Sequence, residues 1–328
     1  MSVVARRASS VALGFVLACL LSFLLVATVS QPAFADDVTT YNIRIADISV
    51  TSANAADVLG DGKVSYDPTT KTLTLTDVNI DTKFDGRNIT NGISIGESDV
   101  TLVLNGANVF TTQQDVFQVC KKGSCTITGT GSLTCFTPNS DSNGIAVMGS
   151  LGQDATLTLA PSFEGTVSAT GSTGIICGGK LNVLGGTLKG DCNGKRASGN
   201  AGGSFYLKLG GTLEIFDGTV FSNTTLSLGS GILSVYGGKL ETGLNAGILG
   251  SELLFPSVIE LGDMVSITNP ERGRICTVTG ISGGIRKAER ISVAAAGVAV
   301  LDYHFFNAAH HVVIEYVGNA TTDTAANG

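Results

Sequence analysis

Short alternating runs of apolar and polar residues recur along the chain, and this recurrence constrains the fold more than any other feature. The runs return at intervals of about 20 to 32 residues, each followed by a turn that carries Gly or Asn. The clearest copies lie at residues 71–76, 100–106, 155–159, 180–186, 212–216 and 232–238. Such a unit buries its apolar edge only against its neighbours, so the pattern predicts a solenoid.

Two further kinds of run complete each predicted coil. One has Gly-Ile followed by another apolar residue, at 91–95, 143–147 and 173–177, and the other closes the coil, at 129–135 and 238–240. Strands of successive coils would stack in parallel about 4.8 Å apart, and Asn-Gly pairs suit the corners. We therefore expect a parallel β-helix over residues 71–270. A closed or sandwiched antiparallel β fold also fits the alternation, but it does not explain why the segments resemble one another.

The two ends of this region depart from the repeat and predict caps, because an uncapped solenoid exposes apolar side chains and free strand groups. Residues 36–70 form the expected N-terminal cap. It contains a strand over 41–50, a short helical turn over 53–59 and a hairpin over 62–75, centred on Asp-Pro-Thr-Thr. Residues 271–317 form the expected C-terminal cap, with antiparallel strands near 291–301 and 311–317. Residues 318–328 are a polar tail.

The first 35 residues have the pattern of a secretory signal peptide. Two arginines precede a long apolar stretch, and Ala33 and Ala35 provide small residues before a cleavage site at Asp36. The mature chain is then expected to be secreted and extracellular, without membrane attachment. If it stays uncut, the apolar stretch would act as a membrane anchor.

Charge excludes some partners of the mature chain. Removal of the signal takes away two of the 20 basic residues and none of the 27 acidic ones, so the formal charge falls from −7 to −9. An acidic chain lacks the basic footprint that nucleic acid requires, and it is also ill suited to anionic membranes. The 43 glycines fit many tightly turned strands better than a helical domain.

Six cysteines remain after the signal: Cys120, Cys125, Cys135, Cys177, Cys192 and Cys276. Export permits disulfides, and the short spacing between Cys120 and Cys125 predicts a local loop closure. The alternation places Cys135 and Cys177 on the core side of their strands, where free Cys acts as a small apolar residue. No Cys-x-x-Cys is present, so the usual zinc spacing is absent.

Residues 64–67, 73–80, 91–93 and 102–106 together resemble the opening of secreted right-handed parallel β-helix proteins of bacteria. Those proteins are of the carbohydrate-binding or cell-surface type. The resemblance covers the cap and the first two coils. It implies a right-handed coil, an exported location, and sugar binding or adhesion as the function, and it leaves retention at the cell surface open.

The outward positions of the first kind of run carry the candidate chemistry. In sequence order they read Thr74, Val103, Thr158, Asn182, Glu214, Ser234 and Glu260. Only Glu214 and Glu260 are charged, and two coil steps would separate them by roughly 9.6 Å. That is near the ~6.5–9.5 Å between the carboxylates of inverting glycosidases. A polysaccharide-degrading enzyme, either an inverting hydrolase or a lyase, is therefore the alternative function, although outward Glu side chains are more often simply solvated.

The sequence offers a candidate Ca²⁺ loop. Asn139, Asp141 and Asn143 place oxygens at alternating positions before Gly144, as in the first half of such a loop. Ser150 stands at the twelfth position, where a bidentate acid is expected, so a solvated corner is the competing interpretation.

The predicted ligand-binding face comprises Asn182, Glu214, Ser234, Tyr236 and Glu260. The chain has no Trp and six Tyr, of which Tyr206 and Tyr236 lie in or beside strands and could stack on sugar rings or pack internally. Recognition would otherwise depend on many weak hydroxyl and amide contacts. We expect a non-catalytic protein that recognises an extracellular polysaccharide or cell-surface glycan. A purely structural surface protein remains the third alternative.

Overall fold

The structure, a computed structural model, describes residues 37–149, 155–194, 203–251, 257–282, 285–297 and 309–318. The chain divides into the units Met1–Thr39 and Thr40–Gly328, and all described strands belong to the second. No helix occurs among the described residues, and none there could cross a membrane. The predicted signal segment and residues 319–328 of the predicted tail lie outside the described residues.

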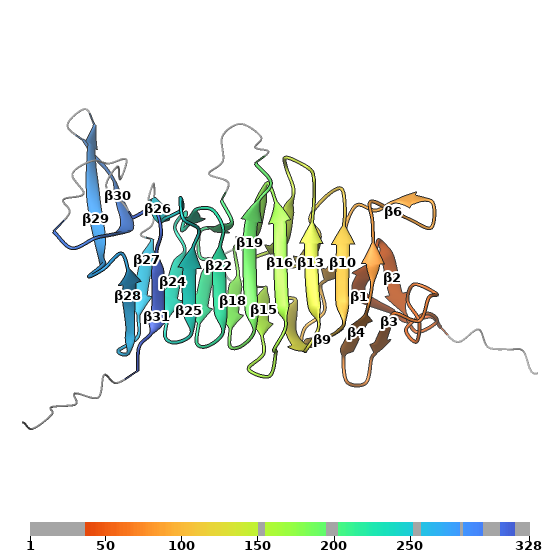
Figure 1. Cartoon of the computed structure of the whole chain (residues 1–328). Coiled ribbons are helices and arrows are strands. Elements are labelled where there is room, and N and C mark those ends of the chain that lie inside the picture. The colour runs from red at the N-terminus through yellow and green to blue at the C-terminus, as the bar shows by residue number, and fades with distance from the viewer. Residues whose placement is uncertain are drawn as a thin grey trace, which may run out of the picture. The chain divides into compact units, whose positions relative to one another are not determined.

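Three sheets contain nearly all of the described strands (Figure 1). Sheet A has the order β2 (Ile48–Thr51), β1 (Thr40–Ile45), β8 (Ile93–Ile95), β11 (Phe117–Val119), β14 (Asn143–Val147), β17 (Thr173–Cys177), β20 (Phe205–Leu207), β23 (Leu226–Ser227), β26 (Ile248–Ser251), β30 (Ile285–Ala294) and β29 (Arg274–Ser282). Sheet B has the order β3 (Val64–Asp67), β4 (Thr72–Thr76), β9 (Val100–Asn105), β12 (Ser124–Gly129), β15 (Thr156–Leu159), β18 (Lys180–Val183), β21 (Thr212–Ile215), β24 (Ile232–Val235) and β27 (Val258–Leu261). Sheet C has the order β5 (Asn79–Ile80), β10 (Ala107–Thr111), β13 (Ser132–Phe136), β16 (Thr166–Gly171), β19 (Thr187–Cys192), β22 (Thr219–Ser222), β25 (Lys239–Thr242), β31 (Val313–Tyr316) and β28 (Val265–Asn269). A separate hairpin pairs β6 (Lys83–Phe84) with β7 (Arg87–Asn88).

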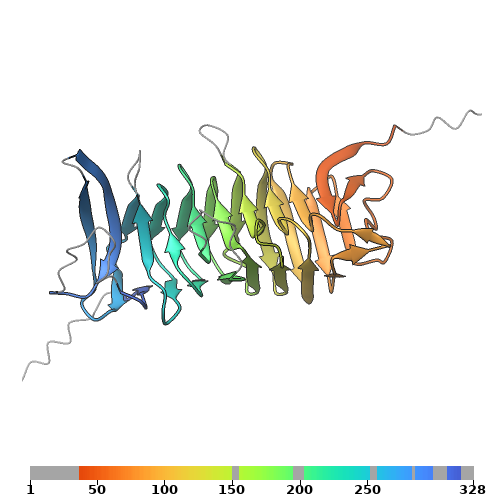
Figure 2. The same ribbon diagram turned by 90° about the horizontal axis from the view of Figure 1, so that it is seen from above.

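The chain visits the three sheets in turn, so that each coil contributes one strand to each sheet. After β8 in sheet A come β9 in sheet B and β10 in sheet C, and then β11 returns to sheet A beside β8. Pairing between equivalent strands of successive coils is parallel from β4 to β27 in sheet B. Seen from above, the coils follow one another in chain order along the stack (Figure 2). The predicted parallel stacking is therefore present, and the unit is an all-β solenoid.

Inward side chains form continuous apolar ladders through the coils. One ladder of sheet B consists of Leu73, Leu102, Ile127, Leu159, Val183, Ile215 and Val235. All seven side chains are fully buried. Alternate residues of a strand face opposite sides, so each short strand supplies one to three residues to the core and leaves its alternate residues outside. This burial of apolar surface along the whole stack is the main source of stability.

Two cysteines belong to this core, as the alternation predicted. Cys135 and Cys177 are fully buried, and Cys125 is buried as well, on the ladder between Val100 and Leu157. The structure does not join Cys120 to Cys125, and both thiols are free. The predicted loop closure fails because Cys125 points into the core, whereas the Cys120 sulfur lies 3.5 Å from the Ser94 hydroxyl.

The N-terminal region differs from the sequence prediction in two places. The single strand expected over 41–50 is a hairpin of β1 and β2, which turns at Ala46 and Asp47. Both residues have positive φ, at 48° and 61°, which is the geometry of a tight two-residue hairpin turn. Residues 53–59 form turns instead of the expected helical turn. The hairpin of β3 and β4 is present as predicted, with Asp67 opposite Thr72.

Antiparallel strands also occur at the other end of the sheets. In sheet C, β31 pairs antiparallel with both β25 and β28, and in sheet A, β30 pairs antiparallel with both β26 and β29. The strands predicted near 291–301 and 311–317 correspond to the end of β30 and to β31. Residues 298–308 lie outside the described residues.

The outward ladder predicted from the sequence has the wrong register in its first half. Thr158 pairs with Thr126, which pairs with Thr101, and Thr101 pairs with Thr72. Thr74 and Val103 belong to the neighbouring outward ladder, next to Thr128. The error arises because β9 buries three alternating residues, Val100, Leu102 and Leu104. The pair that aligns with Leu157 and Leu159 is Val100 and Leu102, whereas the prediction used Leu102 and Leu104. From Thr158 onward the predicted ladder is correct.

Candidate functional site

The outer face of sheet B brings the predicted ligand-binding residues together on successive coils. Asn182, Glu214, Ser234 and Glu260 occupy one ladder in that order, through the pairing of β18, β21, β24 and β27. Their neighbours within each strand, such as Leu213 and Ile215, are fully buried, and this fixes the ladder on the outside. With Ser234 between them, the two carboxylates are two coil steps apart, or roughly 9.6 Å.

Glu260 is held in place by two hydroxyl groups from the preceding coil. The Ser234 hydroxyl donates to Glu260 Oε2 over 3.0 Å, and the Tyr236 hydroxyl donates to the same oxygen over 3.1 Å. Ser234 is only 1% exposed, so its contact is shielded from solvent. Hydrogen bonds of this kind restrict the carboxylate to one rotamer and leave its other oxygen, Oε1, free to accept from a ligand.

An exposed aromatic pair lies beside this ladder. The Phe216 and Tyr236 rings have centroids 5.2 Å apart and an interplanar angle of 34°. They are 44% and 41% exposed, so two large aromatic rings lie together at the surface. On the next coil Gly262, whose amide bonds to Val235, lies against the Tyr236 backbone and has no side chain that would cover the ring. The pair therefore offers apolar surface next to two carboxylates.

The sequence prediction missed Phe216 although the alternation could have found it. Phe216 follows Glu214 by two positions, so it shares the outward face, just as Tyr236 shares it with Ser234. Tyr206, the other tyrosine considered, is only half-buried, and its ring packs against Gly229, where a Cβ would lie 2.6 Å from Tyr206 Cε2. That close contact with the backbone identifies Tyr206 as a packing residue.

The opposite end of the ladder contains polar atoms without partners. The Asn182 side-chain amide donates weakly to the Thr158 hydroxyl over 3.4 Å. Asn182 Oδ1 and Thr212 Oγ1 are buried and have no hydrogen-bond partner. Buried polar atoms usually find a partner, so these two add unsatisfied hydrogen-bonding capacity beside Glu214. We call the set Asn182, Glu214, Phe216, Ser234, Tyr236 and Glu260 the sheet B patch.

The predicted calcium loop forms a hydrogen-bonded corner between β13 and β14. The Asn139 side-chain amide donates to the Gln113 carbonyl over 3.0 Å, and the Asn143 side-chain amide donates to Asp115 Oδ1 over 2.8 Å. The Asp141 amide bonds Asn139 Oδ1 over 3.4 Å. Asn139 and Asn143 thus connect adjacent coils. No group of three or more His, Cys, Asp or Glu side chains suited to a metal ion occurs among the described residues, and Ser150 lies outside them.

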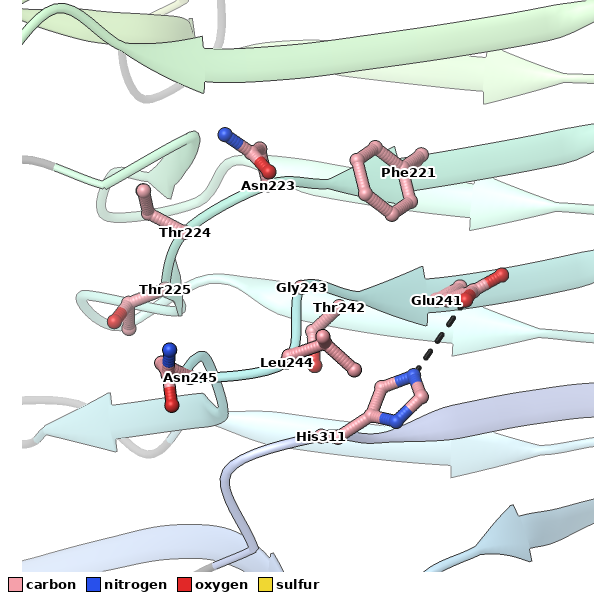
Figure 3. Close-up of a pocket in the computed structure, with 10 residues that line it drawn as sticks. All are labelled: Phe221, Asn223, Thr224, Thr225, Glu241, Thr242, Gly243, Leu244, Asn245 and His311. Atoms are coloured by element: carbon pink, nitrogen blue, oxygen red, sulfur yellow. Dashed lines mark ion pairs between the residues drawn. The ribbon is translucent and has the colours of Figure 1, made fainter.

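A pocket of about 570 Å³ lies elsewhere, at the corner that follows β22 and β25 of sheet C (Figure 3). Its lining comes from two successive coils and from His311, just before β31. His311 Nε2 lies 3.5 Å from Glu241 Oε1, and Lys239 Nζ lies 2.8 Å from Glu241 Oε2. The hydrogen bond from Lys239, followed by the charges of Lys239 and His311, lowers the pKa of the Glu241 carboxyl despite its partial burial.

Comparison of the chain with protein-family models, with curated proteins and with solved structures gave no match.

Proposed function

We propose that the protein is an exported, non-catalytic β-helix that recognises extracellular glycans through the sheet B patch. The observation that carries this proposal is the exposed Phe216–Tyr236 pair beside two carboxylates held in one ladder. Sugar rings have an apolar face and a rim of hydroxyls, so they bind where an aromatic surface adjoins hydrogen-bond acceptors. The formal charge of −9 after signal removal favours neutral glycans or amino sugars over anionic polysaccharides and over nucleic acid.

The same proposal includes a right-handed coil with capped ends. Parallel strands connected within one sheet are right-handed in about 98% of known cases, which supports that hand here. The β1–β2 hairpin at one end of sheet A and the antiparallel strands β28, β30 and β31 at the other are suited to shielding the terminal coils. Retention at a bacterial cell surface, if it occurs, would place the patch toward neighbouring glycans.

Binding to a panel of immobilised polysaccharides tests the function. The mature protein would be passed over cellulose, chitin, chitosan, mannan and pectate, with and without Ca²⁺, and the eluate assayed for reducing ends. We expect retention on one or more neutral or amino-sugar polymers without release of reducing ends. Tyr236→Ala should weaken retention about two- to tenfold, because stacking contributes about 0.5–1.5 kcal/mol.

Phe136→Ala is the matched control, because Phe136 is an exposed aromatic residue on sheet C, at 38% exposure, away from the patch. It should bind like the unmodified protein. Retention on none of the polymers, or equal retention of the Tyr236→Ala variant, would overturn the proposal. A rise in melting temperature with Ca²⁺ that disappears in Asp141→Ala would assign the metal to the corner at residues 139–143.

A polysaccharide-degrading enzyme is the second candidate, and the register of Glu214 and Glu260 favours it. Their separation of roughly 9.6 Å is near the ~6.5–9.5 Å of an inverting pair. Glu260 already accepts hydrogen bonds from Ser234 and Tyr236, which suits a positioned carboxylate. Release of reducing ends that is abolished in Glu214→Gln and in Glu260→Gln would establish this function in place of the first.

A further inference from the structure

The pocket at the end of sheet C is built by two stacked corners, residues 223–225 on one coil and residues 243–245 on the next. Asn223 follows β22, and Gly243 occupies the equivalent position after β25, where its amide bonds to the Ser222 carbonyl. A Cβ at Gly243 would lie 2.1 Å from the Asn223 carbonyl oxygen, so this position requires glycine. The Asn223 side chain bonds to Asp191 on the preceding coil. Because Gly243 has no side chain, this pairing of side chains does not continue to the next coil, and space opens beneath Asn223 (Figure 3).

The pocket has one aromatic wall, and its remaining lining is polar except for Leu244 and Gly243. Phe221 is half-buried on the outer face of β22, one coil away from Glu241 of β25. Figure 3 shows the Phe221 ring on one coil, and Leu244 and Asn245 on the next. Its volume of about 570 Å³ is within the ~300–1,000 Å³ that is typical of small-molecule sites.

Several polar groups of the lining are available to a ligand. Among the described residues, the Thr225 hydroxyl and the Asn245 side-chain amide have no hydrogen-bond partner. The Asn223 amide nitrogen is used by Asp191 Oδ1, at 2.9 Å, which leaves Asn223 Oδ1 as a free acceptor. The pocket thus presents both donors and acceptors, as a ring of sugar hydroxyls requires.

The charge inside the pocket is already balanced. Glu241 is the one carboxylate among the described lining residues, and the Lys239 ammonium and the His311 imidazole contact its two oxygens. A ligand carrying a charge of either sign would have to compete with this arrangement, whereas a neutral polyol would not. His311 also closes one side of the pocket, where the segment before β31 crosses (Figure 3).

We infer that this pocket is a second glycan subsite that holds a single uncharged sugar residue, such as the terminal residue of a chain. The inference rests on glycan recognition as the function, and it adds a site on a different sheet from the sheet B patch. The sheet B patch runs along a ladder of three successive steps, so it suits the interior of a chain. The pocket is closed by His311 on one side and suits a chain end.

Saturation-transfer NMR with simple glycosides tests this inference. The probes are the methyl glycosides of glucose, galactose, mannose and N-acetylglucosamine, with glucuronic acid as the charged comparator. We expect saturation of at least one uncharged glycoside, and weaker saturation of the charged comparator. Phe221→Ala and Asn245→Ala should each reduce the affinity for that glycoside at least fivefold. Asn245 is exposed, so its variant keeps the test valid even if Phe221→Ala fails to fold.

Phe136→Ala is the control, because Phe136 lies outside both sites, and it should leave glycoside binding unchanged. Failure of every uncharged glycoside to bind, stronger binding of the charged comparator, or unchanged affinity in Phe221→Ala and Asn245→Ala would overturn the inference. If polymers are still retained through Tyr236 in that case, the pocket has failed and the proposed function has not. If the unmodified protein binds neither the glycosides nor the polymers, both the pocket and the proposed function are contradicted.

Discussion

Single residues decide how closely the coils can approach one another. Gly190 occupies the inward ladder of sheet C between Ala169 and Ser222. A Cβ there would lie 2.6 Å from the Ser204 carbonyl oxygen and 2.7 Å from Phe205 Cε2. Phe205 is fully buried, so the large ring and the missing side chain fit each other across the interior.

Gly190→Ala should therefore destabilise the fold by about 1–3 kcal/mol, the usual cost of overpacking a well-filled core. Denaturant unfolding monitored by circular dichroism measures the change. Lys189→Ala, at the exposed neighbouring position, is the control and should change stability by less than about 0.5 kcal/mol. An unchanged midpoint for Gly190→Ala would show that Phe205 does not pack against this position.

Burial also makes two thiols unreactive. Desolvation raises the pKa of the Cys125 and Cys135 thiols far above the ordinary value, so the reactive thiolate is scarce at neutral pH. We expect iodoacetamide at pH 8 to leave both unlabelled in the folded protein and to label both in guanidinium, as read by peptide mass spectrometry. Rapid labelling of the folded protein at either position would contradict the inward register of β12 or β13.

At the scale of elements, one carboxylate attaches the N-terminal hairpin to the first coil. Asp47, in the turn between β1 and β2, accepts hydrogen bonds from the Thr90 amide at 2.6 Å, the Thr90 hydroxyl at 2.8 Å and the Asn91 amide at 3.2 Å. Burial raises the pKa of Asp47. The hydrogen bonds from Thr90 and Asn91, together with the charge of Arg44, more than offset that effect and lower the pKa below its ordinary value of 3.8.

Because the folded-state pKa lies below 3.8, the ionised Asp47 stabilises the fold above that pH, and its contribution is lost as the pH falls through the folded-state pKa. Asp47→Asn should lower the melting temperature at pH 7 and reduce the loss of stability between pH 5 and pH 2. Thermal melts across this pH range provide the measurement. If the melting temperature falls equally with pH in the variant and in the unmodified protein, Asp47 does not contribute to the acid sensitivity of the fold.

Which elements could be predicted from the sequence depended on how closely each copied the repeat. The runs at 180–186, 212–216 and 232–238 are near-copies, and their strands pair in the predicted register. Strand β12 follows the Lys-Lys-Gly turn and begins with Ser and Cys, so the coil that it forms was not recognised. The β1–β2 turn also gave no signal, because Ala and Asp at positive φ do not have the Gly or Asn that such a turn usually requires.

The candidate site was predictable only in part for a related reason. The ladder of Asn182, Glu214, Ser234 and Glu260 follows from alternation within each strand. The exposure of Phe216 depends on what the next coils place beside it, here Tyr236 and the side-chain-free Gly262. The pocket near His311 depends on the segment before β31, which crosses beside β25. The Val312 amide there donates to the Thr242 hydroxyl, 70 residues earlier in the chain, and no local pattern in the sequence predicts that contact.

At the scale of the whole molecule, the account depends on coils that advance by one strand spacing each. In sheet B, Thr101, Thr126, Thr158, Asn182, Glu214, Ser234 and Glu260 form one ladder across seven coils. Four steps separate Thr101 from Glu214 and six separate Thr101 from Glu260. At about 4.8 Å per step, these spans are roughly 19 Å and 29 Å. Each further coil therefore adds about one strand spacing to the distance.

Pulsed electron paramagnetic resonance on spin-labelled pairs measures these spans directly. Labels would be placed at 101 and 214 in one variant and at 101 and 260 in another, after replacement of the partly exposed Cys120, Cys192 and Cys276 by Ser. The account predicts that the second mean distance exceeds the first by about 10 Å. Equal distances, or a shorter distance for the 101–260 pair, would contradict the parallel stack and every site built on it.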